Sequence, residues 1–209
     1  EEYAYYLVSE ARQKRVNHIF KLGGNVYAFD STTIDLCLSV FWWAKFRKKK
    51  GGIKVHTLYD VETQIPAFFH ITEASVHDSK AMLEIPYEPG SYYIFDRGYN
   101  NFKMLNRIHL IEANFVVRAK KNLQCKFIKW KRRLPKNVLS DASVLLTGFY
   151  PKQYYPKPIR LVKYWDEEQE REFIFITNAM HISALQVAEL YKNRWQVELF
   201  FKWLKQHLR

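Results

Sequence analysis

The chain has 209 residues, of which 48% are hydrophobic and 17% aromatic, so it can bury a sizeable core and is not disordered as a whole. Its 33 Lys and Arg residues outnumber its 21 Asp and Glu residues, which gives a formal net charge of +12. A domain this basic predicts a polyanionic partner, with nucleic acid as the first candidate and a merely basic surface as the alternative.

The cysteines and the apolar runs indicate the compartment in which the protein works. Cys37 and Cys125 form neither a metal-ligand spacing nor a disulfide framework, which is typical of reduced thiols in a cytosolic protein. No apolar run reaches the roughly 18 residues of a membrane span, and no signal peptide is recognisable. We therefore expect a cytoplasmic protein without a membrane partner. Because the sequence starts at Glu1 and stops inside a predicted helix, we also expect a longer parent chain.

The first part of the chain predicts strands and short helices. The stretch 25–30 (NVYAFD) is typical of a short buried strand that ends at Asp30. Further along, β-branched and aromatic residues on either side of the turn 60–64 predict a β-hairpin. In chain order we expect a helix near residues 9–20, a strand at 25–30, a basic loop at 45–52, hairpin strands at 53–59 and 65–72, and a short helix at 79–85.

The second part of the chain begins with another strand that ends in an acid. This strand is 91–96 (SYYIFD), and its acid is Asp96. Residues 120–137 are strongly basic, Pro135 lies near their end and three further prolines follow at 151, 156 and 158, so we expect a β-rich insert over 120–178. In chain order we expect a strand at 91–96, a helix at 101–112, a strand at 114–119, strands at 159–164 and 172–177, and a helix from 183 to the end without a break.

The alternation of strands and helices indicates an α/β fold with a mixed sheet. In open α/β sheets, ligands bind beyond the carboxyl ends of the strands, which is where Asp30 and Asp96 are predicted. Two carboxylates at neighbouring strand ends repel each other unless a cation lies between them, and hard oxygen ligands suit Mg²⁺. Either aspartate taken alone could equally be a turn or capping residue.

The C-terminal helix offers a third acid. A helical wheel of about 100° per residue groups four polar side chains within an arc of roughly 60°, namely Tyr191, Arg194, Glu198 and Lys205. An apolar stripe beside this arc is expected to face the core, and it consists of Leu190, Val197, Phe201, Leu204 and Leu208. Glu189 points the opposite way, so Glu198 is the acid that can join the two aspartates. The alternative is an ordinary amphipathic helix in which Glu198 pairs with Lys202.

These residues carry a resemblance to a known family. The spacing Tyr191-x2-Arg194-x3-Glu198-x6-Lys205 resembles the YREK signature of bacterial insertion-sequence transposases of the DDE class. The segments that look like the family's other motifs are, in the family's order, Asp30-Ser31-Thr32 for the first aspartate, 51–56 (GGIKVH) for the hairpin, 76–80 (VHDSK) for the segment after it, and Asp96-Arg97-Gly98-Tyr99 for the second aspartate. The resemblance covers about residues 25–209.

The resemblance implies a ribonuclease H-like fold, with a mixed sheet flanked by helices. It also implies a β-rich insert between the second catalytic aspartate and the catalytic glutamate, which agrees with the interpretation of 120–178. The catalytic core would then span 25–209, preceded by an N-terminal helical lead-in at 1–24. The family usually carries a DNA-end-binding domain before this core and further helices after it, and neither is recognisable in the sequence.

The resemblance further implies a reaction and its machinery. Asp30, Asp96 and Glu198 would hold two Mg²⁺ ions, which Mn²⁺ can replace, and Asp30 would bridge both. The ions would support cleavage and strand transfer of double-stranded DNA, with transposon ends and target as partners and a homodimer in the synaptic complex. Such a protein would work in the bacterial cytoplasm, at the nucleoid. Arg194 and Lys205 are expected to contact phosphates, and Tyr191 to donate its hydroxyl to a phosphate near the cut.

Two basic segments, 45–54 and 118–136, are expected to extend the DNA surface. Their aromatic neighbours could stack on an unpaired base or could pack within the protein, and these are Phe46, Phe127 and Trp130. His77 and Asp78 could suggest an acid–base pair. We interpret them as the solvated start of a helix and leave them outside the site.

Other functions compete with the transposase interpretation. A DNA-binding remnant without activity fits the charge equally well, although three intact acids disfavour it. A ribonuclease H-like nuclease or junction resolvase would share the fold and the metals without strand transfer. A phosphatase that uses Asp30 as its nucleophile would usually have a second acid two residues later, where this chain has Thr32.

Overall fold

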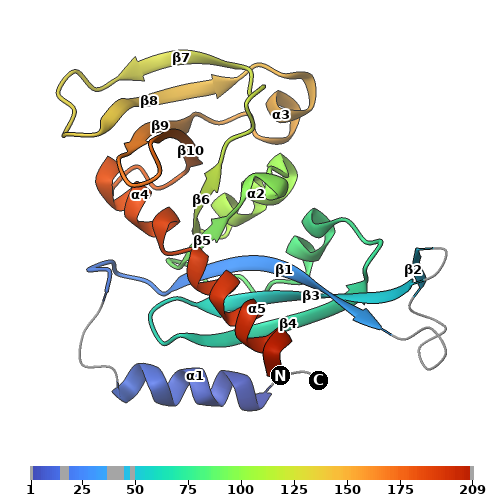
Figure 1. The fold of residues 1–209 in the computed structure, drawn as a ribbon. Coiled ribbons are helices and arrows are strands. Elements are labelled where there is room, and N and C mark those ends of the chain that lie inside the picture. Colours follow the sequence, from blue (N-terminus) through green and yellow to red (C-terminus); the bar gives the residue numbers. More distant parts are fainter. Residues whose placement is uncertain (1, 15–18, 37–44, 48–49, 208–209) are drawn as a thin grey trace. The chain divides into compact units, whose positions relative to one another are not determined.

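The computed structural model describes residues 2–14, 19–36, 45–47 and 50–207. The chain divides into two compact units (Figure 1). Unit 1 combines Glu1–Pro86 with Arg194–Arg209, and unit 2 is Tyr87–Asn193. The last helix of the chain therefore belongs to the same unit as its first strands. No helix among the described residues is long and apolar enough to cross a membrane.

Unit 1 is built on an antiparallel sheet with β3 (Lys50–Asp60) at its centre. One edge of β3 pairs with β1 (Val26–Leu36), and the other pairs with β4 (Ile65–Glu73). The short β2 (Lys45–Arg47) pairs with the start of β3. The predicted hairpin at 53–59 and 65–72 is therefore confirmed, and part of the predicted basic loop is strand.

Asp60 anchors the turn of this hairpin. Its Oδ1 accepts hydrogen bonds from the backbone N–H groups of Glu62 at 2.9 Å and Thr63 at 3.0 Å. Its Oδ2 accepts from Arg12 Nε at 3.0 Å, which ties the turn to α1 (Glu2–Lys14). The helix predicted near residues 9–20 thus begins earlier, at Glu2, and residues 15–18 lie outside the described part of the chain.

The two faces of the unit 1 sheet carry different side chains, because residues alternate along a strand. Asp30 pairs with Thr57, and Thr57 pairs with Phe69, so these three lie on one face. The helix α5 (Trp195–His207) lies against β1, and its Phe200 ring contacts Tyr59 and Phe69 at 5.6 and 6.2 Å. Asp30 therefore lies on the sheet face that α5 covers.

Unit 2 contains a mixed sheet of six strands, in the order β5-β6-β10-β9-β8-β7. The pair β5–β6 is parallel, and the other pairs are antiparallel. The bounds are β5 Tyr92–Phe95, β6 Asn114–Arg118, β7 Cys125–Trp130, β8 Val138–Leu146, β9 Ile159–Asp166 and β10 Arg171–Thr177. All four residues of β5 are buried, as expected for a parallel strand covered on both faces.

Three helices and two 3-10 turns complete the description. They are α2 (Phe102–Leu110), α3 (Phe149–Tyr154), α4 (Ala184–Lys192) and η2 (Arg97–Tyr99) in unit 2, and η1 (Asp78–Leu83) in unit 1. Both α2 and α4 pack on β6. Ser183 begins α4 with a capping box: its hydroxyl accepts from Gln186 N, and the Gln186 side chain accepts from Ser183 N.

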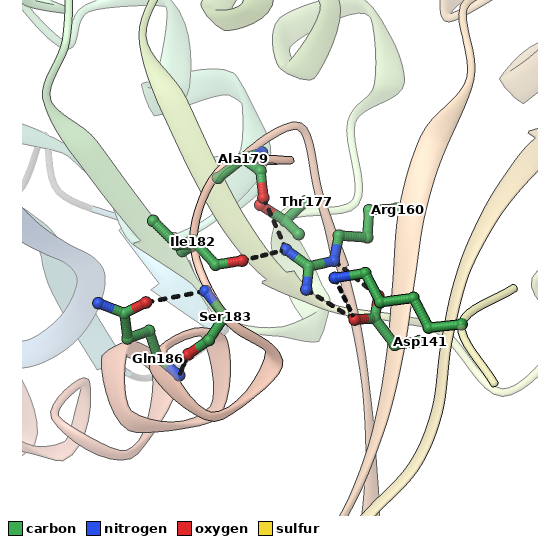
Figure 2. Close-up of polar contacts among 8 residues, drawn as sticks. Asp141, Arg160, Thr177, Ala179, Ile182, Ser183 and Gln186 are labelled. Atoms are coloured by element: carbon green, nitrogen blue, oxygen red, sulfur yellow. Dashed lines mark hydrogen bonds and ion pairs between the residues drawn. The ribbon is translucent and has the colours of Figure 1, made fainter. Parts of the chain in front are cut away.

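A buried ion pair joins the strands of unit 2 to the segment before α4. Arg160 on β9 is 3% exposed and donates to both carboxylate oxygens of Asp141 on β8, at 2.7 and 2.8 Å (Figure 2). The same guanidinium donates to the backbone carbonyls of Ala179 and Ile182 at 3.0 and 2.7 Å. Arg160 thereby fixes the loop whose next residue, Ser183, caps α4.

Two predictions about the elements are wrong. Asp30 does not end its strand, because β1 continues to Leu36, where β3 still pairs with it. The helix predicted from residue 183 onward is interrupted between α4 and α5. At the interruption, the Asn193 side chain donates to the Glu189 carbonyl at 2.9 Å, and the Asn193 backbone N–H caps the end of α4. Tyr191 is therefore not on the same helix as Glu198.

Candidate active site

Unit 1 brings two of the predicted acids together around one arginine. Arg194 Nη1 donates to Asp30 Oδ2 at 2.8 Å, and Arg194 Nη2 donates to Glu198 Oε1. Asp30 comes from β1, Arg194 from the turn just before α5, and Glu198 from the first turn of α5, 164 positions or more further along the chain. Within unit 1, Asp30 and Glu198 thus both contact Arg194, and a catalytic site at these residues stays a prediction.

The two carboxylates around Arg194 both face one positive charge, as the ligands of a cation-binding site do. One guanidinium stands between two carboxylates, so the group carries a net negative charge if all three are ionised. The Asp30 and Arg194 side chains are 21% and 13% exposed, and that of Glu198 is 55% exposed. Carboxylate oxygens facing a shared cation are the donor type that Mg²⁺ prefers, so the chemistry of this pair fits a divalent ion.

Unit 2 positions the other predicted aspartate. Asp96 directly follows β5 and precedes η2, so it lies at the carboxyl end of a buried strand as predicted. The Tyr191 hydroxyl on α4 donates to Asp96 Oδ1 at 2.8 Å. The Tyr191 ring is buried against Phe173 and Phe175 on β10, with centroid distances of 5.8 and 4.8 Å. The ring packing fixes the hydroxyl, which the prediction had assigned to a DNA phosphate.

Lys205 lies on the exposed side of α5, two turns after Glu198. It lines a small cavity of about 190 Å³ together with Thr33, Ile34 and Asp35 of β1. Lys205 is therefore beside the strand that carries Asp30. Of the apolar stripe predicted for this region, Leu190, Val197 and Phe201 are buried, and Leu208 lies outside the described residues.

The predicted set of three acids is divided between the units, with Asp30 and Glu198 in unit 1 and Asp96 in unit 2. Within neither unit do the described residues include three His, Cys, Asp or Glu side chains grouped to hold a metal ion. The convergence of all three acids stays a prediction.

Sequence reasoning missed a set of polar contacts next to Asp30. Asp78, which had been left outside the site, accepts from Ser31 Oγ at 2.7 Å and from Lys54 Nζ at 3.0 Å. Burial by itself would raise the pKa of Asp78. The hydrogen bonds from Ser31 and Lys54, with the charge of Lys54, outweigh burial and hold that pKa below its usual range. The spacing of Asp78 from Ser31, 47 residues, gave no local signal.

The strand β7 and the turn after it carry the basic segment predicted as DNA surface. Every residue of β7 after Cys125 is exposed, including Lys126, Lys129 and two aromatic residues. These aromatics, Phe127 and Trp130, contact each other edge to face at 6.4 Å and are 44% and 62% exposed. They are therefore not packed in the core. The side chain of Phe46 lies outside the described residues.

Comparison with solved structures defines the class of fold. The chain is similar to the piggyBac transposase, as seen in a cryo-EM structure of its synaptic complex with hairpin DNA, with a TM-score of 0.51 and 12% identity. The match covers 87% of this chain and 40% of that protein, and at this identity it shows a shared fold.

Comparison with families is more specific. The model of the family described as "Transposase DDE domain" matches residues 21–209, which is most of the sequence. The chain therefore belongs to the transposase DDE domain family.

Two relatives of this chain are named as transposases. The chain is 35% identical over 186 residues to a protein of Sinorhizobium fredii named as a transposase, covering 86% of this chain and 51% of that protein. It is 28% identical over 179 residues to a protein of Geobacillus stearothermophilus named as the transposase for insertion sequence element IS5377, covering 86% and 47%. The chain thus spans about half the length of these relatives.

Proposed function

We propose that this chain is the catalytic core of a DNA transposase that cuts and rejoins DNA to move an insertion sequence. The observation that carries the proposal is the Asp30–Arg194–Glu198 group. It joins the first predicted aspartate to the predicted glutamate, in a chain of the transposase DDE domain family. In this proposal residues 25–209 form a ribonuclease H-like core with a β-rich insert at 120–178, and residues 1–24 lead into it.

We infer that the site holds divalent ions: two Mg²⁺, for which Mn²⁺ can substitute. Asp30, Asp96 and Glu198 are the proposed ligands, with Asp30 shared between the ions. Bound ions of this kind activate a water or hydroxyl and stabilise the leaving oxygen of a phosphodiester. The residues themselves supply preorganisation. The Tyr191 hydroxyl orients the Asp96 carboxylate, and the Ser31 backbone N–H, which donates to Asp30 Oδ1 at 2.8 Å, orients that of Asp30.

The proposed partner is double-stranded DNA, as transposon ends and as target, bound by a homodimer. Arg194 and Lys205 would neutralise phosphates beside the site, Arg as a fork and Lys as a point charge. The bond to Asp96 supports a positioning role for Tyr191 in place of the expected phosphate contact. The β7 surface (residues 126–133), with its cations and its exposed Phe127 and Trp130, would extend the DNA contact.

A cleavage assay on the full-length protein tests this function. DNA that carries the ends of its insertion sequence is incubated with Mg²⁺, and both cut and joined products are measured. We expect wild type to yield both, and Asp30→Asn and Glu198→Gln to yield neither while still binding DNA. Glu189→Gln, an exposed acid on α4, is the matched control and should act as wild type.

The same assay separates the alternatives. Cut DNA without joined products in the wild type would indicate a nuclease. Binding without either product would indicate an inactive remnant. If Glu198→Gln cut DNA as well as Glu189→Gln does, the proposed catalytic role of Glu198 would be wrong.

A further inference from the structure

A polar cluster lies on the sheet face opposite α5, directly behind the strand of Asp30. Ser31 pairs with His56, and His56 pairs with His70, so their side chains line this face of β1, β3 and β4. Ser31 follows Asp30 in β1, so the two side chains project to opposite faces. His56 is 0% exposed, and its Nε2 is 2.9 Å from Thr72 Oγ1. His56 is therefore buried within unit 1, while Ser31 and His70 are half-buried.

Asp78 is the acceptor at the centre of this cluster. Its Oδ1 lies 2.7 Å from Ser31 Oγ and 3.0 Å from Lys54 Nζ. Lys54 is held in turn, because its Nζ also donates to the Val76 carbonyl at 2.7 Å and its side chain is 14% exposed. The place of Asp78 is set by the start of η1, where the His77 ring accepts from Ser79 N at 3.2 Å. Two strands, β1 and β3, thus meet the start of η1 at one carboxylate.

Ser31 connects this cluster to the candidate site. Its hydroxyl is bound by Asp78 on one face of the sheet, while its backbone N–H donates to Asp30 Oδ1 at 2.8 Å on the other. A shift of Ser31 therefore moves the donor that orients Asp30. Asp30 Oδ2 accepts from Arg194, and the N–H of Ser31 contacts the other carboxylate oxygen. A chain of contacts from Lys54 through Asp78 and Ser31 ends at a proposed metal ligand.

We propose that Asp78, held by Lys54, is a positioning residue for Asp30, acting through Ser31. The inference rests on the proposed function, since it takes Asp30 as a metal ligand. Residues that hydrogen-bond to a metal ligand and orient it usually tune metal affinity. Removing one typically lowers that affinity about ten- to a hundredfold. An alternative role for Asp78 is to hold η1 on the sheet, in which case its loss would lower stability without affecting metal binding.

The test is a Mn²⁺ titration of the full-length protein, read by the electron paramagnetic resonance signal of free Mn²⁺, with thermal unfolding measured alongside. We expect Asp78→Ala and Ser31→Ala to weaken Mn²⁺ binding about ten- to a hundredfold. Ser31→Thr, which keeps a hydroxyl, should restore it, and Glu84→Ala, an exposed acid just after η1, should bind as wild type. If Asp78→Ala fails to fold, the Ser31→Ala and Ser31→Thr pair decides.

Two outcomes overturn the inference, and they are distinguishable. If wild type binds Mn²⁺ and Asp30→Asn does not, but Ser31→Ala binds as wild type or Ser31→Thr restores nothing, only the positioning role fails. If wild type binds no Mn²⁺, or Asp30→Asn binds as tightly as wild type, the metal site of the proposed function fails and the inference fails with it.

Discussion

Tyr191 donates to Asp96, and Arg194 donates to both Asp30 and Glu198. Only the contact between Arg194 and Glu198, four residues apart, follows from sequence spacing. The tyrosine is buried at 8% exposure, and its ring packs on two phenylalanines of β10, so its hydroxyl has little freedom to reach elsewhere. We therefore expect the Tyr191 hydroxyl to orient the Asp96 carboxylate that it contacts. This role predicts a different effect of substituting Tyr191 from the effect that a direct contact between Tyr191 and DNA would predict.

We predict that Tyr191→Phe lowers the free energy of unfolding by about 1–2 kcal/mol, because a hydrogen bond to a carboxylate is lost while the ring packing is kept. Mg²⁺-dependent cleavage should fall, and DNA affinity measured without divalent ions should not change. Urea unfolding, cleavage and binding assays check this, with Tyr164→Phe on β9 as the control. A loss of metal-free DNA affinity would instead assign the Tyr191 hydroxyl to a phosphate.

At this scale the sequence predicted the acids better than their partners. Asp96 follows its strand and Glu198 lies on a helix as predicted, because strand ends and helix spacing are local signals, whereas Asp30 lies inside β1. The shared site of the three acids stays a prediction. Asp78 and Arg160 were not found, because their partners lie 47 and 19 positions away and only folding brings them together. The motif around Asp78 was recognised, and its contact with Ser31 was not.

Among the elements, the strands were the most predictable and the helix breaks the least. The hairpin β3–β4 and the strands β5, β6, β9 and β10 were predicted because their β-branched and aromatic runs are bounded by turns. The end of β1 was set too early, because polar residues after Asp30 look like a terminus yet continue to pair with β3. The break between α4 and α5 contains neither Gly nor Pro, so the sequence offered no breaker.

Among the contacts between elements, those of the buried Arg160 have the clearest expected effect on the free energy of unfolding. We predict that Arg160→Met destabilises the protein by about 3–5 kcal/mol, because Asp141 would keep a buried charge and two carbonyls before α4 would lose their donor. Lys163→Met, on the same strand, is the control. It removes only a surface pair 4.0 Å from Glu172 and should cost less than about 1 kcal/mol.

Urea unfolding of both variants measures these costs. Lys131 also lies 2.9 Å from Asp141, so it offsets part of the charge and places the expected value at the lower end of the range. Equal stabilities for Arg160→Met and Lys163→Met would show that the buried pair does not hold α4 in place.

For the whole molecule, the net charge of +12 was the most informative single quantity. Charge and composition predicted a globular protein that binds nucleic acid, and for this member of the transposase DDE domain family DNA binding stays a prediction. The sequence did not predict the division of the chain into two units. Unit 1 contains the last helix of the chain together with strands from the first part of the chain. Contacts between residues so far apart leave no local pattern in the sequence.

The β7 surface allows a quantitative test of DNA binding by this charge. We predict that Lys126→Gln combined with Lys129→Gln reduces the salt slope of log K by about two, because each phosphate contact contributes about 0.9. The control is Lys103→Gln combined with Lys157→Gln, two exposed lysines elsewhere in unit 2, and the slope should not change. Equal slopes for the two double variants would place the DNA on another surface.

The central claim is that Asp30, Asp96 and Glu198 bind the catalytic metal together, and metal rescue of thiol variants tests it most directly. A cysteine thiolate is a soft ligand that Mn²⁺ accepts more readily than Mg²⁺ does. We predict that Asp30→Cys, Asp96→Cys and Glu198→Cys each lose cleavage of end-bearing DNA in Mg²⁺ and regain part of it in Mn²⁺. Full activity of any one of them in Mg²⁺, or the absence of rescue in all three, would contradict a metal site shared by these residues.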